Sequence, residues 1–138
     1  MKFLTPGVVA LALLTTPALA DGDIAKGEKT FGKCKSCHMI ATDDGTTLVK
    51  GGKTGPNLYG VIGRTAGTVD GFRYGSDMVA AGQAGLIWTE ENLTEFVQDP
   101  RGFLKTALND SKAKSKMSLK LKKGGADVAA YLASLAAE

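Results

Sequence analysis

The sequence predicts a single all-α domain, and three observations support this. Two amphipathic stretches lie near the two ends, at 23–33 and 126–137, and shorter stretches with helix-capping residues lie between them. The connecting segments are rich in glycine and polar residues, and no alternating strand pattern surrounds the cysteines. A Cys34-Lys35-Ser36-Cys37-His38 run follows the first helical stretch and holds the only two cysteines and the only histidine.

Residues 1–20 are expected to form a cleaved secretory signal. Lys2 provides the charged start, Val8–Leu14 the apolar stretch, and Ala18-Leu19-Ala20 the small-residue cleavage site. The apolar stretch is too short to span a bilayer and no stop-transfer pattern follows it, although an uncleaved anchor is the alternative. The mature protein is then one domain, residues 21–138, exported and soluble, and periplasmic in a Gram-negative bacterium.

The mature chain is close to electrical neutrality. Lys and Arg number 17 and Asp and Glu 14 in the full chain. Loss of Lys2 with a leader that has no acidic residue leaves a net charge of +2. Any electrostatic steering of a partner must therefore come from the distribution of charge over the surface.

The helices at the two ends are predicted to pack together. Between Asp23 and Lys33, Ile24 and Phe31 recur near helical spacing. Gly27 in this helix costs about 1 kcal/mol relative to alanine, which favours a close crossing by another element. In residues 126–137, one helical face carries Val128, Tyr131, Leu132 and Leu135 at i, i+3, i+4 and i+7.

Three shorter helices are predicted between these two. A short helix is expected at Ser76–Ala81, and a firmer one at Thr89–Gln98, where Thr89 can act as N-cap. A further helix is predicted to begin directly after it, with Asp99 as N-cap and Pro100 as the first helical residue. The remaining segments are expected to be irregular: 42–55, the turn-rich stretch through Gly67, and 112–123.

The C-x-x-C-H run is typical of the attachment site of a c-type haem. Cysteines at i and i+3 on one helical turn can form thioethers with the two vinyl groups of one porphyrin, and His38 can then ligate the iron. A structural zinc site needs four Cys or His ligands, and this chain has three. A thioredoxin-like motif needs a βαβ context. An exported disulfide is the remaining alternative, but it would close a very small loop and stabilise little.

The second axial ligand must be a residue of another type, because His38 is the only histidine. Met39 adjoins His38 and cannot comfortably reach the opposite face of the same iron. Met78 lies in a predicted helix, where packing is the ordinary role of a methionine. Met117 lies in a polar, lysine-rich segment, so it is the preferred ligand. Met78 or an open site are the alternatives.

The chain resembles the class I c-type cytochromes, close to mitochondrial cytochrome c and the soluble bacterial cytochrome c2 group. The resemblance covers essentially the whole mature chain and rests on an ordered set of motifs. These are Cys34-Lys35-Ser36-Cys37-His38, Gly55-Pro56-Asn57-Leu58-Tyr59-Gly60, Gly63-Arg64, Phe72-Arg73-Tyr74, Trp88, Lys116-Met117 and the helix around Tyr131. It implies the small cytochrome c fold, with terminal helices packed together and shorter helices and long loops around one covalently bound haem.

The resemblance also implies roles for single residues. The carbonyl of Pro56 is expected to accept the Nδ1 proton of His38, although Pro56 can equally serve only to rigidify a turn. Tyr74 and Trp88 match positions that donate hydrogen bonds to a haem propionate. Arg64 matches a position whose positive charge lowers the electrostatic cost of that propionate. Core packing is the alternative for Tyr74 and Trp88.

Some segments depart from the mitochondrial pattern. The loops 42–54 and 101–116 are longer, and no proline shortly precedes Met117. Phe96 replaces a tyrosine near the methionine sulfur. Because this removes a hydroxyl, the redox potential of the mitochondrial proteins cannot be copied to this chain.

With both axial positions filled, the expected function is electron transfer without enzymatic activity. The haem protein would be a soluble, high-potential, monomeric carrier of single electrons. A five-coordinate or Met-labile haem protein that acts as a peroxidase or binds gases is one alternative. A c-type subunit of a larger oxidoreductase is another.

Basic side chains near the motifs favour docking to acidic patches on membrane redox complexes. A lysine run is also the ordinary composition of a solvated loop. The partners expected are a cytochrome bc complex, a terminal oxidase or a photosynthetic reaction centre, by peripheral contact and without nucleic acid. The docking lysines are Lys33, Lys35, Lys112, Lys114, Lys116, Lys120, Lys122 and Lys123.

Overall fold

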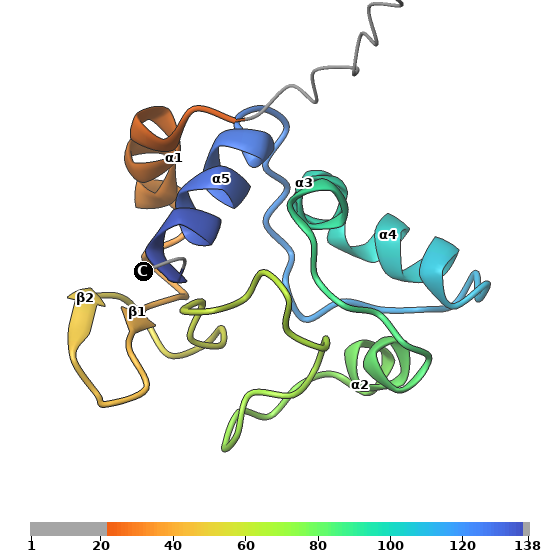
Figure 1. Ribbon diagram of the computed structural model, residues 1–138. Helices are drawn as coiled ribbons and strands as arrows, with labels where there is room; N and C mark the ends of the chain where they lie inside the picture. Colours follow the sequence, from red (N-terminus) through yellow and green to blue (C-terminus); the bar gives the residue numbers. More distant parts are fainter. Residues whose placement is uncertain (1–21, 137–138) are drawn as a thin grey trace, which may run out of the picture.

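The computed structural model describes residues 22–136, so the predicted signal sequence and its cleavage site lie outside the described residues. Helices dominate the fold (Figure 1), and long irregular segments connect them. The elements are α1 (Ile24–Thr30), the 3₁₀ helix η1 (Phe31–Lys33), β1 (Ile40–Ala41), β2 (Thr47–Val49), α2 (Ser76–Gln83), α3 (Glu90–Gln98), α4 (Pro100–Ala107) and α5 (Gly125–Ala136).

The predicted packing of the two terminal helices is confirmed. Helices α1 and α5 lie side by side (Figure 1) and contact each other along their length. The backbone N–H of Asp23 donates to Asp127 Oδ1 at 2.7 Å, and the rings of Phe31 and Tyr131 pack with centroids 5.8 Å apart. A Cβ at Gly27 would overlap the backbone carbonyl of Asp127. The absence of a side chain at Gly27 therefore sets how closely these helices approach.

The predicted caps of the two middle helices are also confirmed. Thr89 and Asn92 cap the start of α3 reciprocally, each accepting the other's backbone N–H at 3.1 and 2.8 Å. Asp99 accepts the N–H of Gly102 at 3.2 Å, and Pro100 is the first residue of α4. Helix α3 packs against α5 and directs Leu93 and Phe96 into the core.

Three expectations about the central segments need correction. The segment 42–55 is not wholly irregular, because Thr47–Val49 pairs with Ile40–Ala41 in a small antiparallel sheet. Helix α2 continues two residues beyond the predicted Ala81, to Gln83. The segment 101–116 is not a loop throughout, since α4 runs to Ala107.

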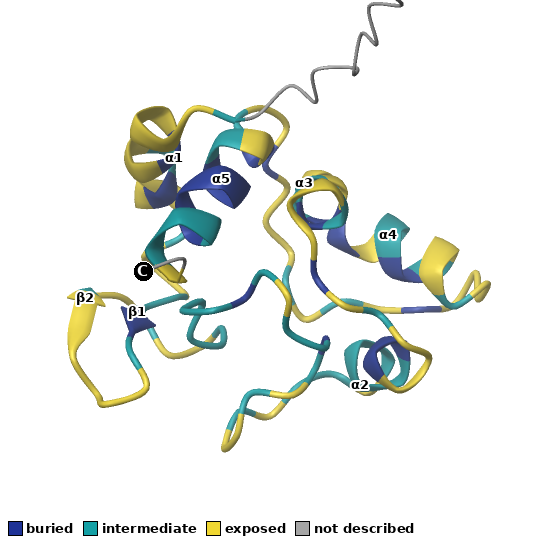
Figure 2. Cartoon of the chain, in the orientation of Figure 1, coloured by how far each residue is buried: buried dark blue, intermediate teal, exposed yellow. Residues whose placement is uncertain are grey.

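Burial divides each helix into an inner and an outer face (Figure 2). Phe31, Ile40 and Leu104 are fully buried, and they come from η1, β1 and α4 respectively. These residues belong to one continuous apolar cluster that also includes Trp88 and Leu132. Within residues 22–136 there is no helix whose length and apolar character would let it cross a membrane.

Replacement of Gly27 by alanine should destabilise the protein by about 1–3 kcal/mol, because the new methyl group must push α1 away from α5. Denaturant unfolding of the haem-loaded protein, followed by far-UV circular dichroism, measures the effect. Gly32→Ala is the matched control, since a Cβ at Gly32 meets nothing within 4 Å and should change stability by less than about 0.5 kcal/mol. Equal stability of the two variants would contradict the close crossing.

Candidate haem site

A cavity of about 490 Å³ lies at the centre of the fold and is lined by residues from almost every part of the chain. Its wall is mainly apolar, which keeps water away from whatever the cavity holds. The apolar side chains come from the central loops, from α2, α3, α4 and α5, and from the segments before α3 and before α5: Leu58, Val61, Phe72, Met78, Trp88, Leu93, Phe96, Val97, Leu104, Met117, Leu119, Val128 and Leu132.

The Cys34–His38 run extends the first helix by one further turn at the edge of this cavity. The N–H of Cys37 donates to the carbonyl of Cys34 at 3.2 Å, and the N–H of His38 donates to the same carbonyl at 2.9 Å. This turn brings the thiols of Cys34 and Cys37 to the cavity, where both are free. The i, i+3 spacing in the sequence thus places both thiols in the wall of one cavity.

The two thiols differ in their surroundings. Burial raises the pKa of Cys34, and the neighbouring Cys37 raises it further. Cys37 is exposed, and its pKa is lowered by hydrogen bonds from Thr54 and then Ser36. Both positions remain chemically available, because no disulfide joins them.

The His38 ring has one nitrogen occupied and one free. The carbonyl oxygen of Pro56 lies 2.8 Å from Nδ1, which is the contact that the family resemblance implies. A carbonyl can only accept, so Nδ1 carries the proton and Nε2 of the neutral ring keeps its lone pair. Burial lowers the pKa of His38, with a smaller opposing effect from the Pro56 hydrogen bond. The ring is therefore held neutral and in a fixed orientation, as a histidine that ligates a metal needs to be.

Three glycines allow the chain to approach the Cys34–His38 turn closely. A Cβ at Gly51 would overlap the carbonyl of His38, and a Cβ at Gly52 would overlap that of Ser36. A Cβ at Gly55 would overlap the imidazole ring itself. The amides of Gly52 and Gly55 donate back to Lys35 O and Cys37 O at 2.8 and 2.7 Å. The sequence interpretation missed this role of Gly51 and Gly52, although a glycine-rich run was visible there.

Another part of the cavity wall carries donors that suit an anion. Arg64 donates through Nη1 to the carbonyls of Asn57 and Tyr59 at 3.1 and 3.3 Å, and burial lowers its pKa. Within residues 22–136 no carboxylate forms a salt bridge with Arg64. The hydroxyl of Tyr74 accepts from Val69 N at 3.1 Å, so its own proton remains available. Trp88 is 5% exposed and its side chain also lines the cavity.

Two methionines line the same cavity, and they come from different elements. Met78 lies on α2, and Met117 lies in the irregular segment 112–121 between α4 and α5, named here the Met117 loop. Phe96 is also part of the wall, as expected of a residue close to a sulfur ligand. Met39 does not line the cavity. Met78 and Met117, the two candidates for the second iron ligand in the sequence, are thus both at the cavity.

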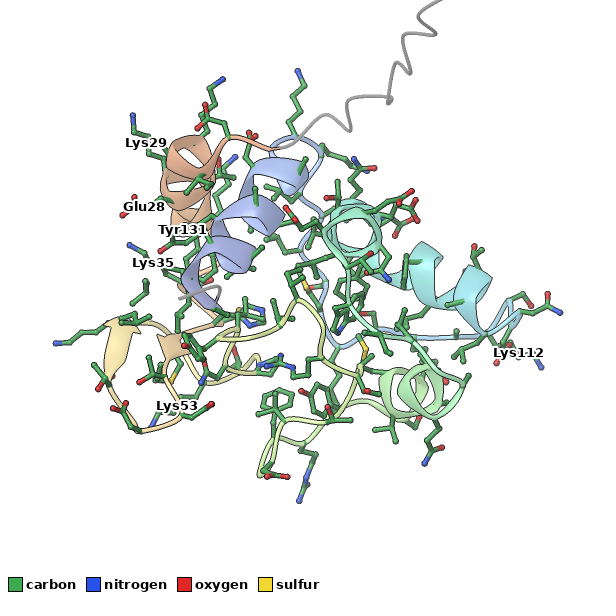
Figure 3. The ribbon with its side chains drawn as sticks, viewed as in Figure 1. Glu28, Lys29, Lys35, Lys53, Lys112 and Tyr131 are labelled. Atoms are coloured by element: carbon green, nitrogen blue, oxygen red, sulfur yellow. The ribbon has the colours of Figure 1, made fainter. Side chains whose placement is uncertain are left out.

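The eight predicted docking lysines are all exposed but do not form one compact group. Lys33, Lys114 and Lys116 line the cavity, and the other five do not. Lys35 and Lys112 lie at opposite ends of the molecule (Figure 3). Lys120 pairs with Asp99 at 3.3 Å. The lysines closest to the cavity are thus the first candidates for partner contact.

This set of residues fits a c-type haem. The cavity offers two free thiols on one turn, one imidazole with a free nitrogen, a thioether, an apolar wall and an arginine without a carboxylate partner. Within the described part of the chain, no three His, Cys, Asp or Glu side chains come together as a metal cluster. The chemistry of the donors therefore favours haem iron over a structural zinc.

Comparisons with known proteins agree with the interpretation of the cavity as a site for a c-type haem. No protein-family model matches the chain. Cytochrome c-551 of Roseobacter denitrificans is 62% identical over 128 residues, which cover 93% of this chain and 91% of the relative. Cytochrome c2 of Rhodobacter capsulatus is 59% identical over 132 residues, which cover 96% of each protein.

Solved structures give the same result for the fold. The structure of cytochrome c2 from Rhodobacter capsulatus matches with a TM-score of 0.81 and 62% identity, covering 82% of this chain and 97% of that one. Ferric cytochrome c-550 from Paracoccus versutus matches with a TM-score of 0.81 and 51% identity, covering 84% and 99%. This chain belongs to the class I c-type cytochromes of the bacterial cytochrome c2 and c-550 group, electron carriers that bind one covalently attached haem c.

Proposed function

We propose that the chain is a closed, high-potential electron carrier in which the protein fills both axial positions of its haem. In this proposal Cys34 and Cys37 would hold the haem through thioethers, and His38 and Met117 would hold its iron. The observation that carries it is that the only histidine, with Nδ1 held by Pro56, lines the same cavity as a methionine thioether. With both residues bound to the iron, a substrate would have no access to it.

The bound haem would supply a one-electron couple between Fe(II) and Fe(III). The residues of the chain set the energetics of that couple. Pro56 fixes the ring of His38 and increases its basicity. A methionine sulfur favours the ferrous state, and the apolar wall of the cavity disfavours the extra positive charge of the ferric state. The methionine sulfur and the apolar wall would therefore both raise the reduction potential.

Arg64, Tyr74 and Trp88 are proposed to hold the haem propionates. Arg64 is partly buried and has its guanidinium bonded on one side to Asn57 and Tyr59 carbonyls, so its charge is held in place before any anion binds. The hydroxyl proton of Tyr74 is free to donate because its oxygen already accepts from Val69. A propionate beside these groups would meet a fixed positive charge and oriented donors at little cost.

Met117 is preferred to Met78 because their elements differ. Both methionines pack against the apolar cluster, but Met78 is on a helix, α2, where a methionine packs without any need for a metal. Met117 lies in a loop of mostly exposed residues, with serine on one side and lysine on the other. A thioether that lines the cavity from such a loop is best explained by iron ligation.

The family transfers electrons between redox complexes, and we propose membrane complexes with acidic docking faces as the partners of this chain. A cytochrome bc complex, a terminal oxidase or a photosynthetic reaction centre would satisfy this description. The signal pattern at 1–20 supports a location in the periplasm, where such faces are reached by diffusion. Lys33, Lys114 and Lys116 are exposed beside the cavity and would make the first contacts.

Met117→Ala should remove the weak near-infrared thioether-to-ferric-iron band and let the ferrous protein bind carbon monoxide. Met78→Ala should keep the band and stay unreactive toward the gas, since its loss affects only packing. Absorption spectra of both oxidation states, with and without carbon monoxide, measure these properties. If Met78→Ala opens the iron and Met117→Ala does not, the ligand assignment is wrong. Ready carbon monoxide binding by the unaltered protein would instead support the peroxidase or gas-binding alternative.

The rate of electron transfer to a membrane redox complex should fall as ionic strength rises. The double variant Lys33→Gln, Lys114→Gln should lower the rate at low salt and flatten its salt dependence. Stopped-flow kinetics with the solubilised complex at several salt concentrations measures both properties. Lys29→Gln is the control, because Lys29 is exposed on α1 and does not line the cavity (Figure 3). Rates that do not change with salt would exclude docking through lysines.

A further inference from the structure

The Met117 loop is anchored at both ends by buried apolar residues and is mostly exposed between them. Ala113 is 1% exposed and Leu121 is 4% exposed. The backbone N–H of Leu121 also donates to the carbonyl of Val97 on α3 at 2.7 Å. Met117 lies midway between these anchors and packs against the same apolar cluster, and further contacts hold the residues just before it.

Residues 73–77, which lead into α2 and form its first turn, contact the residues just before Met117. The carboxylate oxygen Oδ2 of Asp77 accepts the backbone N–H of Lys114 at 2.7 Å, across 37 positions of sequence. Nearby, Nζ of Lys116 donates to the carbonyl of Arg73 at 3.1 Å. The side chain of Lys116 also passes over Gly75, where a Cβ would come within 3.4 Å of it. The loop is thus fastened to residues 73–77 just before Met117.

Of these contacts, the one made by Asp77 restricts the loop most. It joins a carboxylate on a short side chain to a backbone amide, and such charge-assisted hydrogen bonds are stronger than neutral ones. Lys116 reaches its acceptor with a long, exposed side chain that loses more rotamer freedom when it is fixed. Beyond Lys114, the hydroxyl of Ser115 donates to the carbonyl of Met117 at 2.9 Å, which continues the chain of contacts to the methionine.

We infer that Asp77 is a positioning residue that holds the Met117 loop against α2 and so keeps the Met117 thioether at the cavity. This inference rests on the proposed function, because it takes Met117 as the axial ligand. Asp77 acts only through the loop, by lowering the population of states in which the loop has lifted away. In those states the axial position would be open to a ligand from solution.

Imidazole added to the ferric protein measures that population, because it can bind only where the methionine has left. Its apparent affinity rises in proportion to the open fraction. Asp77→Ala should bind imidazole about five to ten times more tightly than the unaltered protein, as expected for the loss of one partly exposed charged hydrogen bond. Asp77→Asn retains an acceptor oxygen without the charge, so its affinity should rise only about two- to threefold.

Amide hydrogen exchange at Lys114 supplies a second readout that does not involve ligand binding. In Asp77→Ala this amide should exchange about ten times faster, whereas the amide of Leu121, bonded to Val97, should change little. Glu91→Ala is the matched control for both measurements. Glu91 also lies in the first turn of a helix that lines the cavity, so its loss removes the same charge from the same helix position on α3.

The outcomes separate this inference from the ligand assignment. If Met117→Ala removes the near-infrared band while Asp77→Ala matches Glu91→Ala in imidazole affinity and in Lys114 exchange, Met117 is the ligand and the role of Asp77 is refuted. If Met117→Ala keeps the band, the ligand assignment fails whatever Asp77→Ala does. Tighter imidazole binding and faster Lys114 exchange in Asp77→Ala, with intermediate values in Asp77→Asn, would establish the positioning role.

Discussion

The hydrogen bond between His38 and Pro56 is the interaction on which the rest of the site depends. It uses Nδ1 of the only histidine at 2.8 Å and thereby leaves Nε2 for a metal. The contact exists only because Gly51, Gly52 and Gly55 let the following chain come so close to the Cys34–His38 turn. A Cβ at Gly51 or Gly52 would overlap the backbone of this turn, and one at Gly55 would overlap the imidazole ring itself. The geometry of the Cys34–His38 turn therefore depends on the glycine-rich segment that follows it.

The packing of the helices also positions residues of the site, over longer distances in the sequence. The crossing of α1 and α5 at Gly27 fixes the turn that carries both cysteines, because η1 continues directly from α1. Helix α3 packs on α5 and brings Leu93 and Phe96 to the cavity wall. Helix α2 and the Met117 loop contribute Met78 and Met117 to the same cavity, and hydrogen bonds join the loop to residues 73–77. Binding residues that are distant in sequence thus surround one apolar space of about 490 Å³.

Local patterns in the sequence predicted the elements that depend on local physics. Apolar spacing located α1 and α5, a costly glycine at position 27 marked their crossing, and Thr89 and Asp99 marked the starts of α3 and α4. The small sheet was missed because strands of two and three residues are too short to show an alternating pattern. The contact between Asp77 and Lys114 could not be predicted, since a hydrogen bond across 37 residues leaves no periodic signal.

The proposed role of His38 as a neutral iron ligand depends on its Nδ1 proton being bound to the Pro56 carbonyl. Because the chain has one histidine, ¹⁵N-histidine labelling of the haem-loaded, reduced protein gives the signal of this residue alone. Nuclear magnetic resonance should find a proton on Nδ1 that exchanges slowly with water, and much faster exchange in Gly55→Ala, where a methyl group displaces the ring from the Pro56 carbonyl. A proton on Nε2, or an Nδ1 proton that exchanges as fast as that of a free imidazole, would contradict the account.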